Sequence, residues 1–177
     1  MNEIDFRHDL LPLKNKLFRV ALRITLDRPE AEDVVEDVLV KTWEMRHSPE
    51  LLRVQNLEAY CLTMTRNLAL DRSQRREAQN VSLDDADHEH ITREKADPAP
   101  LPDQIMERDD RLQWVRELFN QLPEKQRTVM QLRDIEEHSY QEITEIMQIT
   151  ESDVKVTLFR ARQALKQLIQ NTPHNGL

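Results

Sequence analysis

The 177-residue chain contains one glycine, Gly176, which stands next to the C-terminus. Glycine permits positive φ and close approach of the backbone to a phosphate, so dinucleotide-binding loops, P-loops and tight β-hairpins depend on it. A body without glycine argues against all three. The chain is instead rich in Leu, Glu, Gln, Arg and Ala, which are good helix formers. We therefore predict an all-α fold, with one ordinary domain or two small ones.

The cellular setting is indicated by what the chain lacks. Its single cysteine, Cys61, cannot form an intramolecular disulfide, which favours a reducing compartment. No segment approaches the roughly 20 apolar residues that cross a bilayer. The N-terminus begins acidic and lacks the apolar stretch of a signal peptide. We expect a soluble, cytoplasmic protein without membrane insertion.

The acidic charge is confined to one segment. The net charge of −8 would by itself argue against nucleic-acid binding. Residues 77–110, however, carry 3 basic and 11 acidic groups, which account for all of it, and the flanking parts are balanced. The segment 78–103 also holds Pro98, Pro100 and Pro102 and few large apolar residues, so it cannot bury enough surface to order itself. We predict a flexible acidic linker over 78–103 between two small helical domains, residues 1–77 and 104–172.

Apolar residues recur at helical spacing in the first half and predict three helices. The first runs from Leu10 to Ile24, and a second stripe begins after Asp27 and ends near Trp43. Ser48-Pro49 then breaks the chain, and a third helix is expected to begin near Asn56.

The second half predicts shorter helices. One helix over about 104–121 ends before Leu122-Pro123, where proline suits the first turn of the next helix. Ser139 and Glu142 form a capping box that opens another short helix. A turn over 147–150 separates it from a long final helix, which is the signature of a helix-turn-helix. Gln148 stands near the place where that turn usually has glycine.

The final helix has two distinct faces at 100° per residue. Val154, Leu158, Ala161 and Leu165 form one side, which we predict to be the core. The other side presents Ser152, Val156, Phe159, Arg160 and Gln163. The apolar residues of this side could pack on thymine methyls, and its arginine could read guanine. Lys155 and Arg162 flank this face and could hold phosphates. An ordinary surface helix, or a face that binds a protein partner, is the alternative interpretation.

Two charged helical surfaces stand out in the first half. Four arginines against one aspartate lie between Arg66 and Arg76, which suits nucleic acid or the C-terminal dipole of a helix. The second helix opens with acids, of which Glu36 and Asp37 lie beyond the first turn. These acids indicate a docking surface for a basic protein partner, with dipole preference as the alternative.

The motifs in both halves resemble conserved regions of bacterial sigma factors. Region 2 is matched by the run from Glu30 to Val38 with Lys41-Thr42-Trp43, and by the run from Tyr60 to Arg72. Region 4 is matched by the runs Leu122 to Arg127, Leu132-Arg133-Asp134, Ser139 to Ile143, Val154-Lys155 and Phe159 to Arg162. The order and the absence of extra domains are similar to the extracytoplasmic-function (ECF, group IV) class of the sigma-70 family.

This resemblance implies partners and site residues. The first domain is expected to dock on the β′ clamp helices of core RNA polymerase through Asp33, Glu36, Asp37 and Val40. It is also expected to meet the promoter −10 element through Asn56, Tyr60, Arg66, Asn67, Asp71, Arg72 and Arg75. The second domain is expected to contact the β flap and to read the −35 element through Ser152, Lys155, Val156, Phe159 and Arg160. The resemblance also implies an anti-sigma factor. Thr157 stands where many relatives have a basic residue, so the resemblance does not predict which −35 sequence is recognised.

Other classes of function are weaker. A stand-alone helix-turn-helix transcriptional regulator would explain residues 123–170 but not the region 2 motifs. Glu44 with His47 has di-iron spacing, yet such sites need two such motifs and further glutamates. His88-Glu89-His90 lies in the predicted linker without a closed ligand set, and Cys61 is expected to be a small buried hydrophobe. We expect no enzyme activity, no cofactor and no metal site.

Overall fold

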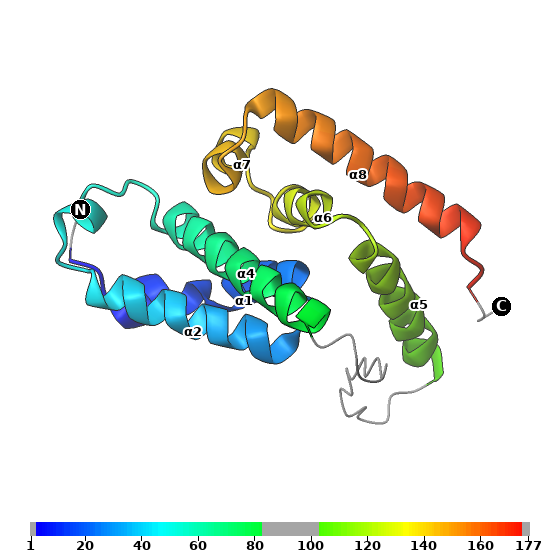
Figure 1. Cartoon of the computed structure of the whole chain (residues 1–177), viewed down its shortest axis with the longest axis horizontal. Coiled ribbons are helices and arrows are strands. Elements are labelled where there is room, and N and C mark those ends of the chain that lie inside the picture. The colour runs from blue at the N-terminus through cyan, green and yellow to red at the C-terminus, as the bar shows by residue number, and fades with distance from the viewer. Residues whose placement is uncertain (1–2, 83–102, 175–177) are drawn as a thin grey trace.

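The computed structural model describes residues 3–82 and 103–174; for Ser82 and residues 103–108 it describes only the backbone. Within these ranges every regular element is helical, as the sequence predicts (Figure 1). The first half contains a π-helical turn (Phe6–Leu10), a 3₁₀ turn (Leu11–Leu13) and the helices α1 (Lys14–Thr25), α2 (Arg28–Glu44), α3 (Pro49–Leu52) and α4 (Leu57–Ser82). The second half contains α5 (Asp103–Asn120), α6 (Glu124–Met130), a π-helical turn (Gln131–Ile135), α7 (Tyr140–Met147) and α8 (Glu151–Asn171).

Short polar side chains begin the helices where the sequence predicts them. Asp27 accepts from the backbone N–H of Glu30 at 3.0 Å, at the start of α2. Ser139 and Glu142 form both halves of the capping box at the start of α7. The short connection to α8, residues 148–150, ends in a further cap, where the Thr150 hydroxyl oxygen accepts from the backbone N–H of Asp153 at 3.1 Å. The helix-turn-helix over α7 and α8 is therefore confirmed.

Helix ends are closed without glycine. Leu26 after α1 and Gln148 after α7 adopt left-handed backbone, with φ of 53° and 55°. Glu137 does the same with φ of 61°. A non-glycine residue in this region costs roughly 1–2 kcal/mol. The turn position anticipated at Gln148 is therefore real, and glutamine occupies it with some strain.

The α4 helix is longer than the sequence pattern predicts. It continues to Ser82, five residues into the segment expected to be linker. Residues 78–81 are exposed. Residues 83–102, the rest of the predicted linker, lie outside the described part of the chain.

Each half packs its helices around buried apolar residues. In the first half, α1, α2 and α4 pack together, and Cys61 is fully buried among them as expected. In the second half, α6, α7 and α8 enclose Leu132, Ile143, Ile146 and Leu158. The predicted inner face of α8 is confirmed at Val154, Leu158 and Ala161, which are buried, whereas Leu165 is only half-buried.

The two halves pack against each other, an arrangement that the sequence leaves open. Helix α1 contacts α6, and α4 contacts α7, so buried residues of both halves join in one cluster. Figure 1 shows α8 on the side of the molecule away from α1 and α2. We call the contact between α1 and α4 on one side and α6 and α7 on the other the seam.

Candidate nucleic-acid interface

The outer face of α8 presents the predicted reading residues to solvent. Phe159 is 65% exposed and Val156 is 42% exposed, which is unusual for large apolar side chains on one helix face. Ser152, Lys155 and Arg160 are exposed on the same helix. Thr157, in contrast, is buried and donates to Asp153 at 3.2 Å, so it lies behind the face rather than on it.

The cations that flank this face are already paired. Lys155 lies 2.7 Å from Glu151, a contact that raises the pKa of the lysine. Arg162 forms a two-point ion pair with Asp134. Both side chains are half exposed or more, so such pairs are weak and can exchange for phosphate contacts.

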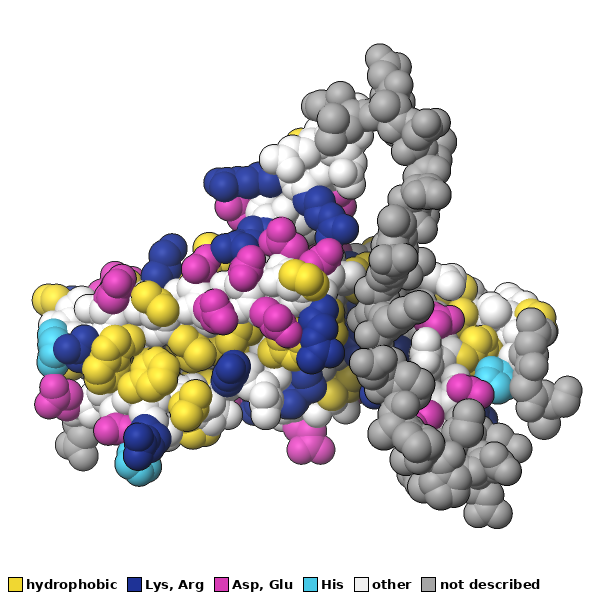
Figure 2. Space-filling model, turned by 90° about the horizontal axis from the view of Figure 1, so that it is seen from below, with side chains coloured by type: hydrophobic (Ala, Val, Ile, Leu, Met, Phe, Trp, Pro, Cys, Tyr) yellow, Lys and Arg dark blue, Asp and Glu magenta, His cyan; other side chains and the backbone are white. Residues whose placement is uncertain are grey.

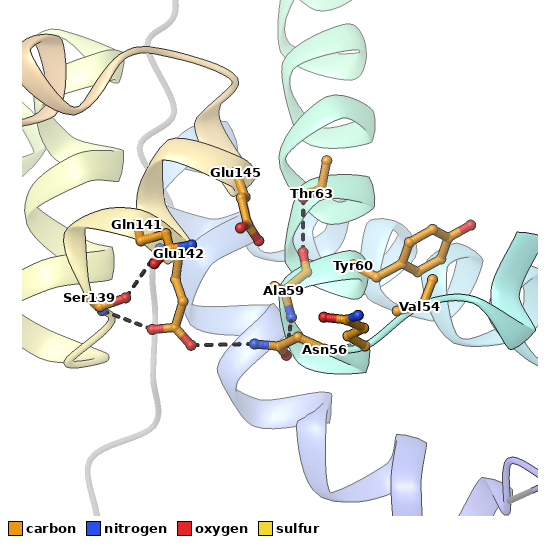
Figure 3. Close-up of a pocket in the computed structure, with 10 residues that line it drawn as sticks. Val54, Asn56, Ala59, Tyr60, Thr63, Ser139, Gln141, Glu142 and Glu145 are labelled. Atoms are coloured by element: carbon orange, nitrogen blue, oxygen red, sulfur yellow. Dashed lines mark hydrogen bonds between the residues drawn. The ribbon is translucent and has the colours of Figure 1, made fainter. Parts of the chain in front are cut away.

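A cleft of about 500 Å³ surrounds the predicted −10 residues at the start of α4 (Figure 3). Asn56 caps α4, since its Oδ1 accepts from the N–H of Ala59 at 3.0 Å. Tyr60 is half-buried, and that burial raises the pKa of its hydroxyl. The opposite wall belongs to the second half and consists of Ser139, Gln141, Glu142 and Glu145. The cleft therefore lies across the seam.

Arg72 of α4 is engaged by the acidic helix α2, which the sequence pattern did not reveal. Arg72 lies 2.5 Å from Asp37 and also 3.5 Å from Glu30 and 3.6 Å from Asp33. Arg75 is paired with Asp71 at 3.2 Å. The predicted basic surface and the predicted acidic surface thus neutralise each other in part.

Two other predicted residues of α4 are placed differently. Arg66 is half-buried, and its Nε is enclosed without a hydrogen-bond partner, so it is less accessible than its position opposite the apolar stripe suggests. Asn67 is exposed and accepts from Arg66 at 3.3 Å.

The predicted polymerase-docking residues remain accessible. Asp33, Glu36 and Asp37 are exposed along α2, and Val40 is 54% exposed. Figure 2, seen from the side of α2, shows acidic side chains in a row beside a hydrophobic patch. A groove of about 560 Å³ separates α2 from α4 and is lined by Lys41, Glu44, Met45, Met64, Asn67, Leu68 and Asp71. Acidic and apolar groups in this combination suit a basic amphipathic helix.

Arg127 holds the seam together through backbone carbonyls. Its guanidinium donates to Arg23 O at 2.8 Å and Ile24 O at 3.5 Å, at the end of α1. It also donates to Leu122 O at 2.6 Å and Asn120 O at 3.2 Å in its own half. The arginine thus satisfies carbonyls that helix ends leave free, in both halves at once. Burial lowers the pKa of Arg127.

An ion pair closes the seam at its edge. Arg19 of α1 donates to both carboxylate oxygens of Glu136, each at 2.7 Å, and Gln131 donates to the same carboxylate at 2.9 Å. Only 3% of the Glu136 side chain is exposed. Burial opposes its ionisation, but the hydrogen bonds from Arg19 and Gln131 outweigh burial, and the pKa of Glu136 is lowered.

Glu58 connects the two halves near the cleft. Lys16 lies 2.5 Å from its Oε1, and His138 Nε2 lies 3.3 Å from the same oxygen without hydrogen-bond geometry. His138 Nδ1 is 3.4 Å from Glu142. The sequence predicts Glu142 as part of a capping box but not as a contact between the halves, because no local motif marks contacts between segments so far apart.

The described residues offer no sign of the weaker classes of site. None of their His, Cys, Asp and Glu side chains gather in threes in a way that could hold a metal ion. His47 is exposed, and the Cys61 thiol is buried, which raises its pKa to about 11. His88-Glu89-His90 lies outside the described residues. Across the described ranges, the helices lack the length and apolar character needed to cross a membrane.

Family comparisons match both halves of the chain. The family described as Sigma-70 region 2 matches residues 12–79, which cover α1 to most of α4. The family described as Sigma-70, region 4 matches residues 112–165, which include the helix-turn-helix.

Individual relatives match nearly the whole chain. The chain is 30% identical over 156 residues to the ECF RNA polymerase sigma factor SigL of Mycobacterium tuberculosis, covering 87% of this chain and 82% of that protein. It is 28% identical over 169 residues to the RNA polymerase sigma-H factor of Pseudomonas aeruginosa, covering 92% and 86%.

Solved structures show the same fold. The sigma factor RpoE from Bartonella quintana, solved with the anti-sigma factor NepR, matches with a TM-score of 0.73 and 25% identity, over 96% of this chain and 99% of that one. CnrH, solved with the cytosolic domain of CnrY, matches with a TM-score of 0.65 at 18% identity, over 95% and 89%.

Proposed function

The chain belongs to the ECF RNA polymerase sigma factors, which direct transcription initiation. From this membership we propose which of its surfaces bind the two promoter elements and which bind core polymerase. Sigma factors are non-catalytic initiation factors, and we infer that this one has no enzymatic activity of its own. We place it in group IV, with a domain over residues 1–77, a linker over 78–103 and a domain over 104–172. Because core RNA polymerase acts in the cytoplasm, we infer that this protein is cytoplasmic.

The outer face of α8 is proposed to read the −35 element in the major groove. The observation that carries this assignment is the exposure of Phe159 and Val156 beside Arg160 on the second helix of a helix-turn-helix. Apolar side chains can pack on thymine methyls, and a guanidinium can bond guanine with two hydrogen bonds. Ser152 and Lys155 would add contacts at the start of the helix.

The start and outer side of α4 are proposed to bind the −10 element. Asn56 and Tyr60 border the cleft, where an unpaired base could enter and stack. The remaining contacts are proposed for Arg66, Asn67, Asp71, Arg72 and Arg75. The ion pairs of Arg72 do not exclude this role, because a guanidinium has five donors and can bind phosphate while it is held by carboxylates.

The exposed acids of α2 are proposed to bind core polymerase. Asp33, Glu36, Asp37 and Val40 would dock on the β′ clamp helices, and the second domain would contact the β flap. The complex of one structural neighbour, RpoE of Bartonella quintana with the anti-sigma factor NepR, supports an anti-sigma factor as a further partner.

Transcription in vitro tests this proposal. The protein is mixed with a cognate core polymerase and a genomic promoter library, and the transcripts are sequenced. We expect start sites that require both components and that share two promoter elements. Phe159→Ala and Arg160→Ala should each weaken binding to the −35 duplex by about tenfold, whereas Lys166→Ala, on an exposed position of the same helix, serves as the matched control.

The competing function is a stand-alone helix-turn-helix regulator. It predicts specific duplex binding by the protein alone and no initiation when core polymerase is supplied. That result would overturn the assignment of α2 and α4 while leaving the role of α8 intact.

A further inference from the structure

His138 lies in the seam between one carboxylate of each half. It is buried, with only 6% of its side chain exposed. Its Nε2 lies 3.3 Å from Glu58 Oε1 on α4, and its Nδ1 lies 3.4 Å from Glu142 Oε2 on α7. Its backbone is held on both sides, because its N–H donates to Leu132 O at 2.9 Å and its carbonyl accepts from Arg133 at 2.8 Å. The imidazole is therefore fixed where it can contact both halves.

A neutral imidazole cannot donate to both carboxylates. It carries one N–H and one lone pair, and a carboxylate only accepts, so one of the two carboxylates must face the lone pair. The imidazolium has two N–H groups and can donate to both. In the structure, Nε2 is enclosed without a hydrogen-bond partner, although Glu58 lies close to it. Protonation of the ring would supply the donor that Glu58 and Glu142 cannot share.

Charged groups from four elements surround the imidazole. Lys16 of α1 lies 2.5 Å from Glu58 Oε1, the same oxygen that His138 Nε2 approaches. Arg133 of the π-helical turn lies at the His138 carbonyl. These two cations oppose a positive charge on the ring, whereas the carboxylates of Glu58 and Glu142 favour it. Because Lys16 can balance only one of the two carboxylates, an imidazolium has the other left to balance.

Glu142 keeps its charge in the pH range where histidine titrates. The backbone N–H of Ser139 donates to its carboxylate at 2.8 Å and lowers the pKa of Glu142 against the effect of burial. Asn56 of the first half also donates to it at 3.3 Å (Figure 3). Histidine is the side chain whose charge ordinarily changes near neutral pH. A change of pH around neutrality therefore alters the ring and leaves the Glu142 carboxylate in place.

We propose that His138 makes the packing of the two halves sensitive to pH, with its imidazolium holding Glu58 of the first half and Glu142 of the second half together. The added stability is present while the ring is protonated and is lost as the pH rises and the ring gives up its proton. Packing of the halves is thus coupled to the uptake of a proton. The inference concerns the seam alone and does not depend on which nucleic acid or protein the surfaces bind.

Opening of the seam in urea measures this coupling. The full chain carries a donor and an acceptor dye at Glu32→Cys on α2 and Gln167→Cys on α8, two exposed positions, while the native Cys61 is buried. Energy transfer as a function of urea gives the equilibrium constant for opening at about pH 5.5 and at about pH 8.5, a range that lies above the ordinary pKa of carboxyl groups. For the wild-type seam, we expect opening to be at least about fivefold more favourable at the higher pH.

Three variants assign the pH dependence to the proposed contact. His138→Gln keeps a donor and an acceptor but cannot take up a proton, so it should lose most of the difference between the two pH values. Glu58→Gln retains the histidine but removes the carboxylate of the first half, and it should lose the difference as well. His47→Gln, at an exposed histidine of the first half, is the matched control and should retain it.

The results that would overturn the proposal are distinct. Equal pH dependence in wild type and H138Q does so, as does a seam that becomes tighter when the pH rises. A dependence that survives in E58Q would show that the effect does not cross the seam. If His138→Gln fails to fold, nitrogen-15 spectra of labelled histidine report on the unsubstituted protein. Both ring nitrogens of His138 should then carry protons at about pH 5.5, and a neutral ring in the packed protein at that pH overturns the proposal.

Discussion

Replacing Arg127 tests whether one side chain stabilises both a domain and the seam. We consider Arg127→Met, which keeps the aliphatic stem but removes every donor. Two of the four hydrogen bonds of Arg127 are short, at 2.6 Å within its own half and 2.8 Å to Arg23 across the seam. The other two are longer, at 3.2 and 3.5 Å.

The magnitude follows from the short bonds. A net hydrogen bond from a charged donor contributes roughly 1.5–3 kcal/mol, and burial of the guanidinium, which lowers its pKa, favours the lower end. Two such bonds give about 3 kcal/mol in the free energy of unfolding, of which about half acts across the seam. Arg127→Lys should recover less than half, because an ammonium cannot reach carbonyls on both sides at once.

Two measurements separate the contributions. Urea unfolding followed by circular dichroism gives the total, and small-angle X-ray scattering gives the separation of the halves. Arg111→Met, at an exposed arginine of α5, is the matched control and should change stability by less than about 0.5 kcal/mol. The reasoning is refuted if R127M is as stable as the control. Lost stability with an unchanged scattering profile would refute the part assigned to the seam.

Three further predictions address single features. Gln148→Gly should raise the free energy of unfolding in urea by about 0.5–1 kcal/mol, since glycine accepts the left-handed backbone without strain; a loss would contradict this. The lowered pKa of Glu136 contributes stability above its ordinary value of 4.5 that disappears as the pH falls through the folded-state value. Thermal unfolding from about pH 6 to about pH 3 should therefore bring wild type and Glu136→Gln closer together, and a constant gap would argue otherwise. Cys61, with a pKa of about 11 and no exposure, should react with a thiol reagent at about pH 8 only after unfolding; rapid labelling of the folded chain would contradict the burial.

The features that the sequence predicts correctly depend on neighbouring residues. The caps at Asp27 and Ser139 act over three residues, and the inner face of α8 follows from a repeat of 3.6 residues. The turn at Gln148 also depends only on residues close to it in the sequence. Secondary structure and the helix-turn-helix could therefore be assigned before any tertiary contact was known.

The features that the sequence did not reveal depend on distant residues. Arg72 pairs with Asp37 at a separation of 35 residues, so the basic and acidic surfaces cannot be counted as independent. Arg127 and Arg23 are 104 residues apart, and no spacing rule connects a side chain to a backbone carbonyl at that range. The end of α4 was misplaced for another reason: exposed helix formers such as Ala78 and Gln79 carry no signal for where a helix stops.

The reach of Arg127 has a consequence for the chain as it is made. The carbonyls at the end of α1 emerge from the ribosome 104 residues before the guanidinium that binds them. At about 5–20 residues per second, the end of α1 therefore stays hydrated for roughly 5–20 seconds of translation before Arg127 is made. The contact between the two halves can therefore form only after most of the chain has been made.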